Sequence, residues 1–468
     1  MNQNQEHTSP PSPTIPVARR GSARSRWKQR IRRVLRFSVT VLVCLVFIGW
    51  WRVLRIVEGD NWPPPADAVT ADEAQGMTEE FLRRSNPQCD DVAIAYAPTT
   101  ASDVDLFSGG AQFLPAILND ITNAKSSIHV MMFGFLSGEW GTRIADTLIV
   151  KARAGVEVRI SVDGYGSKVS STSKAMFDAM AEAGVQIVVN DIFPLQENGL
   201  QPDPSFSLLQ NELGRADHRK MLVIDGERGW IGGGGFEDHF YTDGFHDVFV
   251  QVRGDIVLQM QAVFLTSFSA YGGPLARTEG SLNFYFPDPV PPGAIPVTLL
   301  QNIPGGFVPG TEASREIIEE STERLEIMNP YLTDAGIIDR IVDAADRGVA
   351  VHIVVPGSSN NAPADDALMY QHGRLTDAGV QLWSYPTVMH AKVTVADDRV
   401  VVGTINYDAW ALYRNLEIAL LIDDATIADE VVSTFVEPSV ATSTHSGPED
   451  GWSEDVKRWF WNKFTYFL

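Results

Sequence analysis

The amino-acid sequence predicts an α/β body of two similar halves, preceded by a single transmembrane helix. Three observations lead to this fold class: one order of helices and strands occurs twice, each copy carries the same histidine and lysine motif, and the segment Phe37–Trp51 has no charged residue. An internal repeat is informative because it fixes the architecture before any motif is considered. Strands that alternate with helices favour an α/β body.

The first 56 residues differ in charge from the rest of the chain. They contain eleven Arg and Lys residues and one acid, whereas the whole chain of 468 residues carries a net charge of −22. Residues 1–36 are polar and basic and predict a disordered segment. Residues 37–56 reach the roughly 20 positions that a membrane helix needs, and the basic residues before them predict a cytoplasmic N-terminus. A cleaved signal peptide or a buried core helix is the alternative.

The body repeats one plan of amphipathic helix, turn and buried strand. Residues 114–135 follow this plan and residues 314–332 repeat it. Two later helix-to-strand junctions also match, with Gly155 and Gly184 in the first copy and Gly348 and Gly379 in the second. Glycine is favoured there because a helix often ends on a left-handed residue. We therefore expect a spacer over 57–102, a first half over 103–285, a second half over 286–440 and an aromatic tail over 441–468.

Each half contains the spacing H-x-K-x4-D once. The residues are His218, Lys220 and Asp225 in the first half and His390, Lys392 and Asp397 in the second. Residues two apart on a strand face the same side, so each histidine should project beside its lysine. An imidazole beside an ammonium group suits attack on a phosphodiester, because the cation stabilises the phosphoryl oxygens. The aspartates belong to the motif but face away by the same alternation, and we interpret them as structural.

A turn rich in small residues and then an acid follow each motif. The turns are residues 231–235 and 402–406, where the backbone can approach an anionic group closely. Asp247 comes 29 residues after His218, and Glu417 comes 27 residues after His390. A carboxylate at a similar distance in both halves predicts a partner that orients each imidazole. One copy of the motif alone would favour a chance surface strand, but two matched copies favour a catalytic site.

With these motifs the chain resembles the phospholipase D superfamily, and most closely the bacterial cardiolipin synthases. The resemblance covers residues 104–436 and includes the stretches 155–167, 217–220, 246–254, 329–331, 389–392, 403–406 and 415–417. It implies two phospholipase D-type α/β halves packed about a pseudo-two-fold axis. It also implies that the reaction needs no cofactor and no metal.

The resemblance further implies a role for each site residue. His218 would be the nucleophile that becomes phosphatidylated, and His390 would be the general acid and base. Lys220, Lys392 and Asn406 would hold the phosphate, and Asp247 and Glu417 would orient the histidines. Gly235 occupies the place in the first half where Asn406 stands in the second. That departure removes a side-chain amide donor from the first half.

The function that the resemblance implies is transfer of a phosphatidyl group from phosphatidylglycerol, which gives cardiolipin. The enzyme would sit in the cell membrane with its catalytic body on the extracytoplasmic side and with phospholipids as partners. Hydrolysis to phosphatidic acid is the nearest alternative. The acidic body argues against nucleic acid as a partner, and hence against a nuclease, while a non-catalytic scaffold has no need of two histidines.

Two further segments each leave two interpretations open. The loop Phe193–Arg215 is either a lid over His218 or a packed surface loop. The aromatic tail lies either in the lipid interface or against the body.

Overall fold

The computed structural model describes residues 98–190, 216–241, 244–274, 284–286, 293–303, 308–447, 452–463 and 465. The chain divides into two compact units, residues 1–62 and 63–468, and every described residue belongs to the second unit. The predicted transmembrane segment 37–56, the disordered segment 1–36 and the loop 193–215 lie outside the described residues. In the part that is described, no helix is both long and apolar enough to cross a membrane.

The first half is built on a mixed sheet, which has seven strands among the described residues. Three neighbouring strands are parallel, and the other four continue the sheet in antiparallel pairs. In spatial order the strands are β2 (Asp103–Ser108), β8 (Val248–Arg253), β7 (Arg228–Gly232), β6 (Lys220–Ile224), β3 (Ser127–Met132), β4 (Glu157–Asp163) and β5 (Gln186–Asn190).

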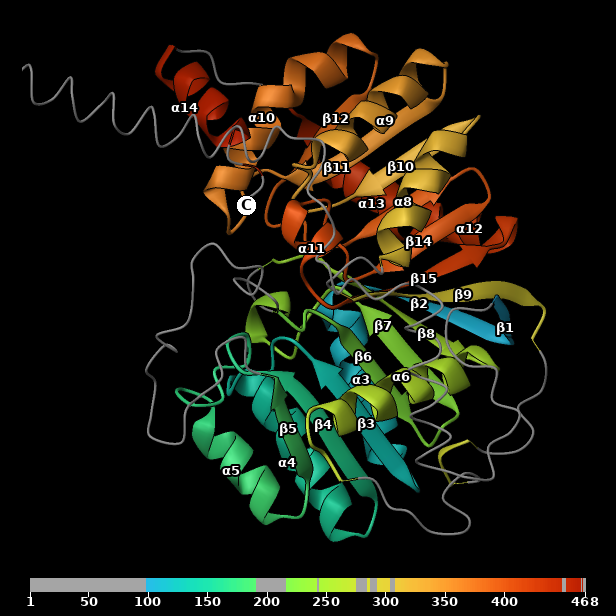
Figure 1. Ribbon diagram of the computed structural model, residues 1–468, viewed down its shortest axis with the longest axis vertical. Coiled ribbons are helices and arrows are strands. Elements are labelled where there is room, and N and C mark those ends of the chain that lie inside the picture. The colour runs from blue at the N-terminus through green and yellow to red at the C-terminus, as the bar shows by residue number, and fades with distance from the viewer. Residues whose placement is uncertain are drawn as a thin grey trace, which may run out of the picture. The chain divides into compact units, whose positions relative to one another are not determined.

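The sheet of the second half has nine strands among the described residues, and most strands of both sheets are labelled in Figure 1. In spatial order its strands are β1 (Thr99–Ala101), β9 (Ile295–Asn302), β15 (Glu417–Asp423), β14 (Arg399–Gly403), β13 (Val393–Ala396), β10 (Arg324–Met328), β11 (Ala350–Pro356), β12 (Gln381–Tyr385) and β16 (Thr444–His445). The seven strands from β9 to β12 follow the same order and the same parallel and antiparallel pattern as β2 to β5. The α/β fold and its repeated plan, both predicted from the sequence, are confirmed.

Helices connect the strands of each half. The first half contains α3 (Gly110–Asn123), α4 (Glu139–Arg153), α5 (Lys174–Glu182), the 3₁₀ helix η1 (Asp238–Phe240) and α6 (Ile256–Ala270). The second half contains α8 (Pro309–Glu320), α9 (Ala335–Asp346), α10 (Ala362–Asp377), α11 (Ala409–Tyr413), α12 (Ala425–Val431), the π-helical turn η2 (Val432–Val436), α13 (Glu437–Thr442) and α14 (Trp452–Asn462). Helix α6 contacts strands of both sheets.

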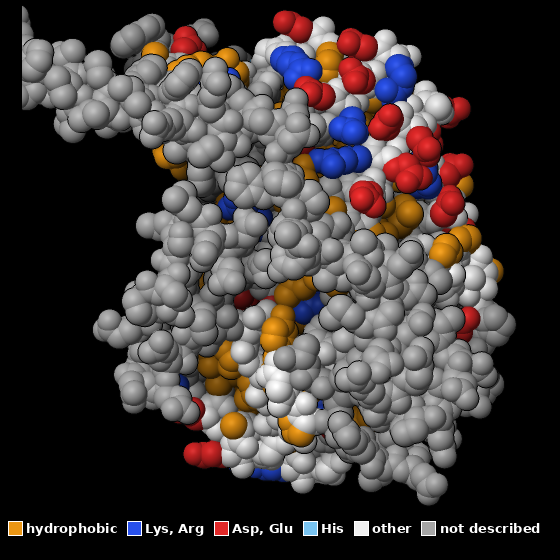
Figure 2. All heavy atoms as spheres, in the orientation of Figure 1, with side chains coloured by type: hydrophobic (Ala, Val, Ile, Leu, Met, Phe, Trp, Pro, Cys, Tyr) orange, Lys and Arg blue, Asp and Glu red, His pale blue; other side chains and the backbone are white. Residues whose placement is uncertain are grey.

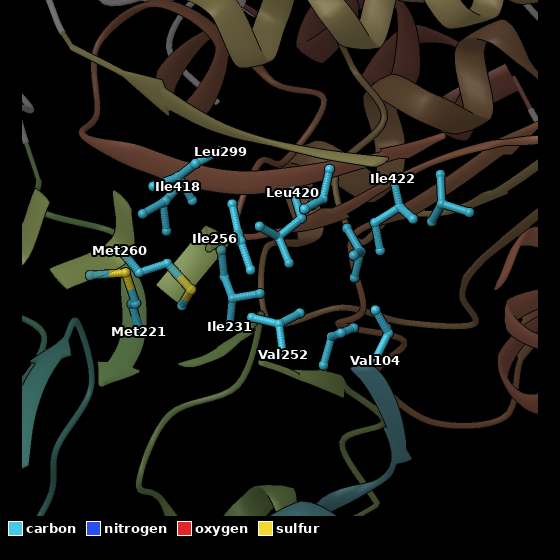
Figure 3. Packing of buried hydrophobic residues seen from close by; sticks show 14 of the residues in the cluster. Val104, Met221, Ile231, Val252, Ile256, Met260, Leu299, Ile418, Leu420 and Ile422 are labelled. Atoms are coloured by element: carbon cyan, nitrogen blue, oxygen red, sulfur yellow. The ribbon is translucent and has the colours of Figure 1, made fainter. Parts of the chain in front are cut away.

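A continuous apolar core joins the two halves. It combines Met221 of β6, Ile231 of β7, Met260 of α6, Leu299 of β9 and Ile418 of β15, each fully buried (Figure 3). Two separate cores fill the opposite faces of the two sheets. Because both faces are covered, the motif strands β6 and β13 are buried at every residue, which explains their nearly unbroken apolar sequence.

The four glycines at the repeated helix-to-strand junctions adopt the expected left-handed conformation. Gly155, Gly184, Gly348 and Gly379 have φ between 90° and 95°. A Cβ atom at any of these positions would meet nothing within 4 Å. Glycine is therefore required by the backbone conformation and not by a lack of space.

Helices and strands also lie outside the predicted limits of the two halves, residues 103 and 440. Strand β1 precedes Asp103 and pairs with β9 of the second sheet. Helix α14, within the predicted tail, lies against α10, where Lys457 pairs with Asp366 at 3.0 Å and Asn462 accepts from Gln371 at 2.8 Å. The predicted borders of the domains stay predictions.

Candidate active site

Each motif histidine lies just before its strand, where its backbone forms a hydrogen bond with the other half. His218 precedes β6, and its backbone N–H donates to the carbonyl of Leu416 at 3.0 Å. His390 precedes β13, and its N–H donates to the carbonyl of His246 at 2.7 Å. These contacts belong to two isolated parallel bridges, Asp217 with Leu416 and His246 with Met389. Each bridge places a motif histidine beside the acid of the opposite half.

The two acids therefore contact the histidines crosswise. Nδ1 of His218 lies 3.0 Å from both carboxylate oxygens of Glu417, 199 residues further along the chain. Nδ1 of His390 lies 2.7 Å from Oδ2 of Asp247, 143 residues earlier. Both acids are fully buried. An acid on Nδ1 orients the ring and leaves Nε2 for the reacting atom.

Polar contacts fix the two acids in different ways. Glu417 accepts hydrogen bonds from the hydroxyl of Thr404 at 2.5 Å and from the amide of Asn415 at 3.3 Å. Asp247 accepts from its neighbouring backbone N–H, that of Val248, at 2.7 Å. The position in the first half that matches Thr404 is Gly233, where a Cβ atom would come within 2.5 Å of Oδ1 of Asp247. The glycine-rich turn thus leaves room for the carboxylate that orients His390.

The motif lysines lie beside their histidines, as strand alternation predicts. Nζ of Lys220 donates to the carbonyl of His218 at 2.8 Å. Nζ of Lys392 donates to the carbonyl of His390 and lies 2.8 Å from Nδ1 of the same ring. Burial lowers the pKa of Lys220 to about 8 and that of Lys392 to about 7, although nearby carboxylates oppose the change. Two ammonium groups held this way are suited to the oxygens of one phosphodiester.

Burial also sets the protonation of the histidines and of Glu417. Together with the two lysines it lowers the pKa of His218 well below its ordinary value and that of His390 to about 3. Burial raises the pKa of Glu417 to about 8, against the effect of Lys220. Both imidazoles are therefore neutral near pH 7. A neutral Nε2 carries the lone pair that a nucleophile or a general base needs.

The motif aspartates lie at the far ends of their strands, away from the histidines. The carboxylate of Asp225 accepts hydrogen bonds from the backbone N–H groups of 125–127, at 2.7 to 3.0 Å. Asp397 accepts in the same way from the N–H groups of 322–324, at 2.8 to 3.1 Å. Both aspartates have positive φ, 56° and 51°. Each one ties the turn after a helix to the end of a motif strand, which is a structural role.

Asn406 follows β14 and is buried, and its Oδ1 has no hydrogen-bond partner among the described residues. At the matching position, a Cβ atom on Gly235 would lie 2.6 Å from the carbonyl oxygen of Gly134 and 2.9 Å from Oε2 of Glu237. The backbone and a carboxyl group thus occupy the space that an asparagine side chain would need. Sequence reasoning identified the loss of the amide but not the carboxyl group that replaces it.

Aromatic side chains that the sequence did not single out surround the histidines. The ring of Phe133 lies 4.9 Å from that of His218. Three rings surround His390, with centroid distances of 5.5 Å for Phe240, 6.3 Å for Phe245 and 6.4 Å for Tyr331. Phe133 follows β3 directly and Tyr331 lies three residues after β10, so the two are not at matching positions and the repeat carried no signal for them. Such rings limit the access of water to the reacting atoms.

Comparisons with known proteins identify the family of the chain. A family model described as "Cardiolipin synthase, PLD-like domain" matches residues 117–265 and 315–437, and each matched segment contains one motif. The chain belongs to this family.

Curated relatives within this phospholipase D-like family are cardiolipin synthases. The major cardiolipin synthase ClsA of Bacillus subtilis is 28% identical over 358 residues, which span 72% of this chain and 69% of that protein. The minor cardiolipin synthase ClsB of the same organism is 26% identical over 398 residues, which span 80% of this chain and 92% of that protein. Both matches cover most of this chain.

A solved structure supports the fold. The phosphatidylserine synthase of Haemophilus influenzae superposes with a TM-score of 0.57 at 14% identity, over 84% of this chain and 98% of that one. At this level of identity the likeness concerns the fold alone.

Within the described residues, no group of three or more His, Cys, Asp or Glu side chains could hold a metal ion.

Proposed function

We propose that this protein is a phosphatidyltransferase that forms cardiolipin from two molecules of phosphatidylglycerol. The observation that carries the proposal is the crosswise pairing of two histidines with two buried acids, with a lysine beside each ring. Two neutral imidazoles facing one phosphate allow covalent catalysis, in which one difficult displacement becomes two easier ones. The cardiolipin synthases among the relatives support the choice of substrate.

In the first step, Nε2 of His218 attacks the phosphorus of the donor lipid. A nitrogen–phosphorus bond forms, and the bond from phosphorus to the glycerol oxygen breaks. His390 gives its proton to the departing oxygen, so that glycerol leaves as a neutral alcohol. A bound phosphodiester prepares this step, because its negative charge raises the pKa of His390.

In the second step, a hydroxyl group of another phosphatidylglycerol replaces the glycerol. Nε2 of His390 removes the proton of this hydroxyl, and its oxygen attacks the phosphorus. The bond from phosphorus to His218 breaks and cardiolipin leaves. Lys220, Lys392 and Asn406 hold the phosphoryl oxygens in both steps.

Hydrolysis is the competing outcome, because water can take the place of the second alcohol. The aromatic rings beside His218 and His390 favour transfer, since they reduce the water that reaches the phosphorus.

A nuclease is disfavoured by the acidic body. Where α8 and α9 lie, the face shown in Figure 2 mixes charges of both signs. Among the ion pairs of these helices are Arg340 of α9 with Glu319 of α8, and Arg374 of α10 with Asp339 of α9.

The position of the enzyme at the membrane is part of the proposal. We place a transmembrane anchor at residues 37–56, with the basic N-terminus in the cytoplasm and the catalytic body on the other side. The two halves would be related by a pseudo-two-fold axis that passes between His218 and His390. The matched strand orders and the reciprocal histidine–acid pairs support this axis.

The test supplies the purified full-length enzyme with phosphatidylglycerol as its sole lipid. We expect release of glycerol and formation of cardiolipin, with phosphatidic acid as a minor product. Expression in a host that lacks cardiolipin should restore cardiolipin to its lipid extract. Phosphatidic acid as the main product, despite abundant lipid alcohol, would establish the hydrolase instead.

A further inference from the structure

One carboxyl group near the two histidines has no role in the mechanism above. Glu237 follows β7 and precedes η1, and its side chain is 17% exposed. It makes no capping hydrogen bond to η1. Its matching residue in the second half is Asp408, which caps α11 by accepting from the N–H groups of Trp410 and Ala411 at 2.8 and 2.9 Å. The two halves therefore use this position differently.

Glycine lets the Glu237 carboxyl group turn inward. A Cβ atom on Gly134 would lie 2.8 Å from Oε1 of Glu237, and a Cβ atom on Gly235 would lie 2.9 Å from Oε2. Asn406 holds the place in the second half that corresponds to Gly235. The first half thus has a carboxyl group in the region where the second half has an amide.

The surroundings of Glu237 link it to both histidines. Lys220 is the cation that most strongly opposes the rise in its pKa. Oε2 of Glu237 lies 3.4 Å from Nε2 of His239. The His239 ring lies 4.4 Å from those of Phe240 and Phe245, which in turn face His390. His239 and the two phenylalanine rings therefore connect Glu237 to the acid–base histidine, and the charges of Lys220 and Lys168 act on its carboxyl group.

A carboxyl group is poorly suited to bind phosphate at this place, because its charge would repel the phosphoryl oxygens. It is well suited to hydroxyl groups, which donate to a carboxylate in strong hydrogen bonds. Burial raises the pKa of Glu237 to about 7, so near that pH the group both accepts and donates. The imidazole of His239, 32% exposed, adds a second polar group toward solvent.

We propose that Glu237 and His239 form the subsite that binds the hydroxyl groups of the acceptor's glycerol headgroup. This inference rests on the proposed phosphatidyl transfer and names the residues that select a polyol over water or a simple alcohol. The selection follows because a buried group built to bind a hydroxyl rejects an acceptor that leaves it unpaired. Glu237 is thus a specificity residue of the second step.

The experiment measures a ratio of products, which does not depend on the fraction of enzyme that is folded. Full-length enzyme receives phosphatidylglycerol as donor together with equal concentrations of radiolabelled glycerol and ethanol. The readout is labelled phosphatidylglycerol relative to phosphatidylethanol. Glu237→Met removes both oxygens at nearly constant volume, Glu237→Gln restores hydrogen bonding, and Glu227→Met is the matched control on the exposed turn between β6 and β7.

We expect the wild-type enzyme to favour glycerol over ethanol by about tenfold, the value of one charge-assisted hydrogen bond. The preference should nearly vanish in Glu237→Met, return in large part in Glu237→Gln and stay at the wild-type value in Glu227→Met. If Glu237 only balanced the charge of Lys220, its loss would slow both transfers equally, and an unchanged preference would overturn the inference. Cardiolipin formed without either labelled product would overturn this inference alone, whereas an enzyme that forms neither labelled product nor cardiolipin would overturn the proposed function, and this inference with it.

Discussion

Glu417 contacts the ring of His218 at 3.0 Å although the two residues belong to opposite halves of the molecule. Asp247 and His390 form the reciprocal contact. Neither half contains a complete histidine–acid pair, since each supplies the histidine of one pair and the acid of the other. This arrangement gives a physical reason for both halves to be present in one chain.

The crosswise contacts predict which step each acid supports. Glu417→Gln should impair formation of the covalent intermediate on His218 and lower kcat by about 100-fold, because the ring loses the partner that fixes its tautomer. Asp247→Asn should impair the steps that need His390, so that the intermediate persists longer. Rapid quenching with labelled phosphatidylglycerol measures both effects, and Glu430→Gln on the surface is the control. The opposite assignment of the two variants would show that each acid serves the histidine of its own half.

The two histidines should differ in a labelling experiment. His218→Ala removes the nucleophile, so no lipid should become attached to the protein. His390→Ala retains the nucleophile but lacks the group that deprotonates the acceptor, so a phosphatidyl-enzyme should accumulate if glycerol departs without full protonation. The measurement is acid-labile, base-stable radiolabel on the protein, and the double variant should be barely slower than either single one. Label on the His218 variant alone would exchange the two roles.

The lysine pKa values predict the alkaline side of the pH profile. In the free enzyme, Lys392 and Lys220 have pKa values of about 7 and about 8, so both ammonium groups are lost as the pH rises through this range. The value of kcat/KM, which reports the free enzyme, should therefore fall there. Bound phosphodiester is anionic and raises the pKa of both lysines, so kcat should fall only at higher pH. Lys392→Arg stays charged and should flatten the profile, and a wild-type kcat/KM that is constant from pH 6 to roughly 9 would contradict the lysine assignment.

The motif aspartates should affect stability more than chemistry. Asp225→Ala should lower the free energy of unfolding by about 2 to 3 kcal/mol, because it removes the acceptor of several backbone N–H groups. Asp225→Asn, which keeps one acceptor oxygen and tolerates positive φ, should cost less. Thermal unfolding measures the difference, and the control is Asp146→Ala on the exposed face of α4. A loss of kcat in a fully folded Asp225→Ala enzyme would contradict the structural role.

The same carboxylates predict a dependence of stability on pH. Burial acts to raise their pKa values, but the backbone N–H groups outweigh it and hold both below the ordinary value of 3.8. Because the carboxyl pKa is lower in the folded protein than in the unfolded chain, the stabilisation is fully present above the ordinary value of 3.8. It is lost as the pH falls through the folded pKa. The unfolding midpoint of Asp225→Ala should therefore depend less steeply on pH below 4 than that of the wild type, and parallel curves would exclude this contribution.

The sequence by itself determined the repeated architecture and the position of each motif lysine beside its histidine. The spacing of His218 and Lys220 fixed their common face, because the period of a strand is a local property. Gly155 and its three counterparts fixed the helix ends, because only the local backbone conformation decides them. The position of Asp225 and Asp397 away from the histidines agrees with the prediction, although both lie in left-handed turns beyond their strands.

Only the tertiary structure decided which residues meet. The spacing of Asp247 and Glu417 indicated orienting acids but not the partner of each, because a contact across 199 or 143 residues depends on how the two sheets join. The bridges before His218 and His390 make that choice. Glu237 was missed for a related reason: its carboxyl group matters only because Gly134 and Gly235, separated in the chain, leave the same space open. Sequence periodicity describes the face on which a side chain lies, and the packing of the two halves determines what that face contacts.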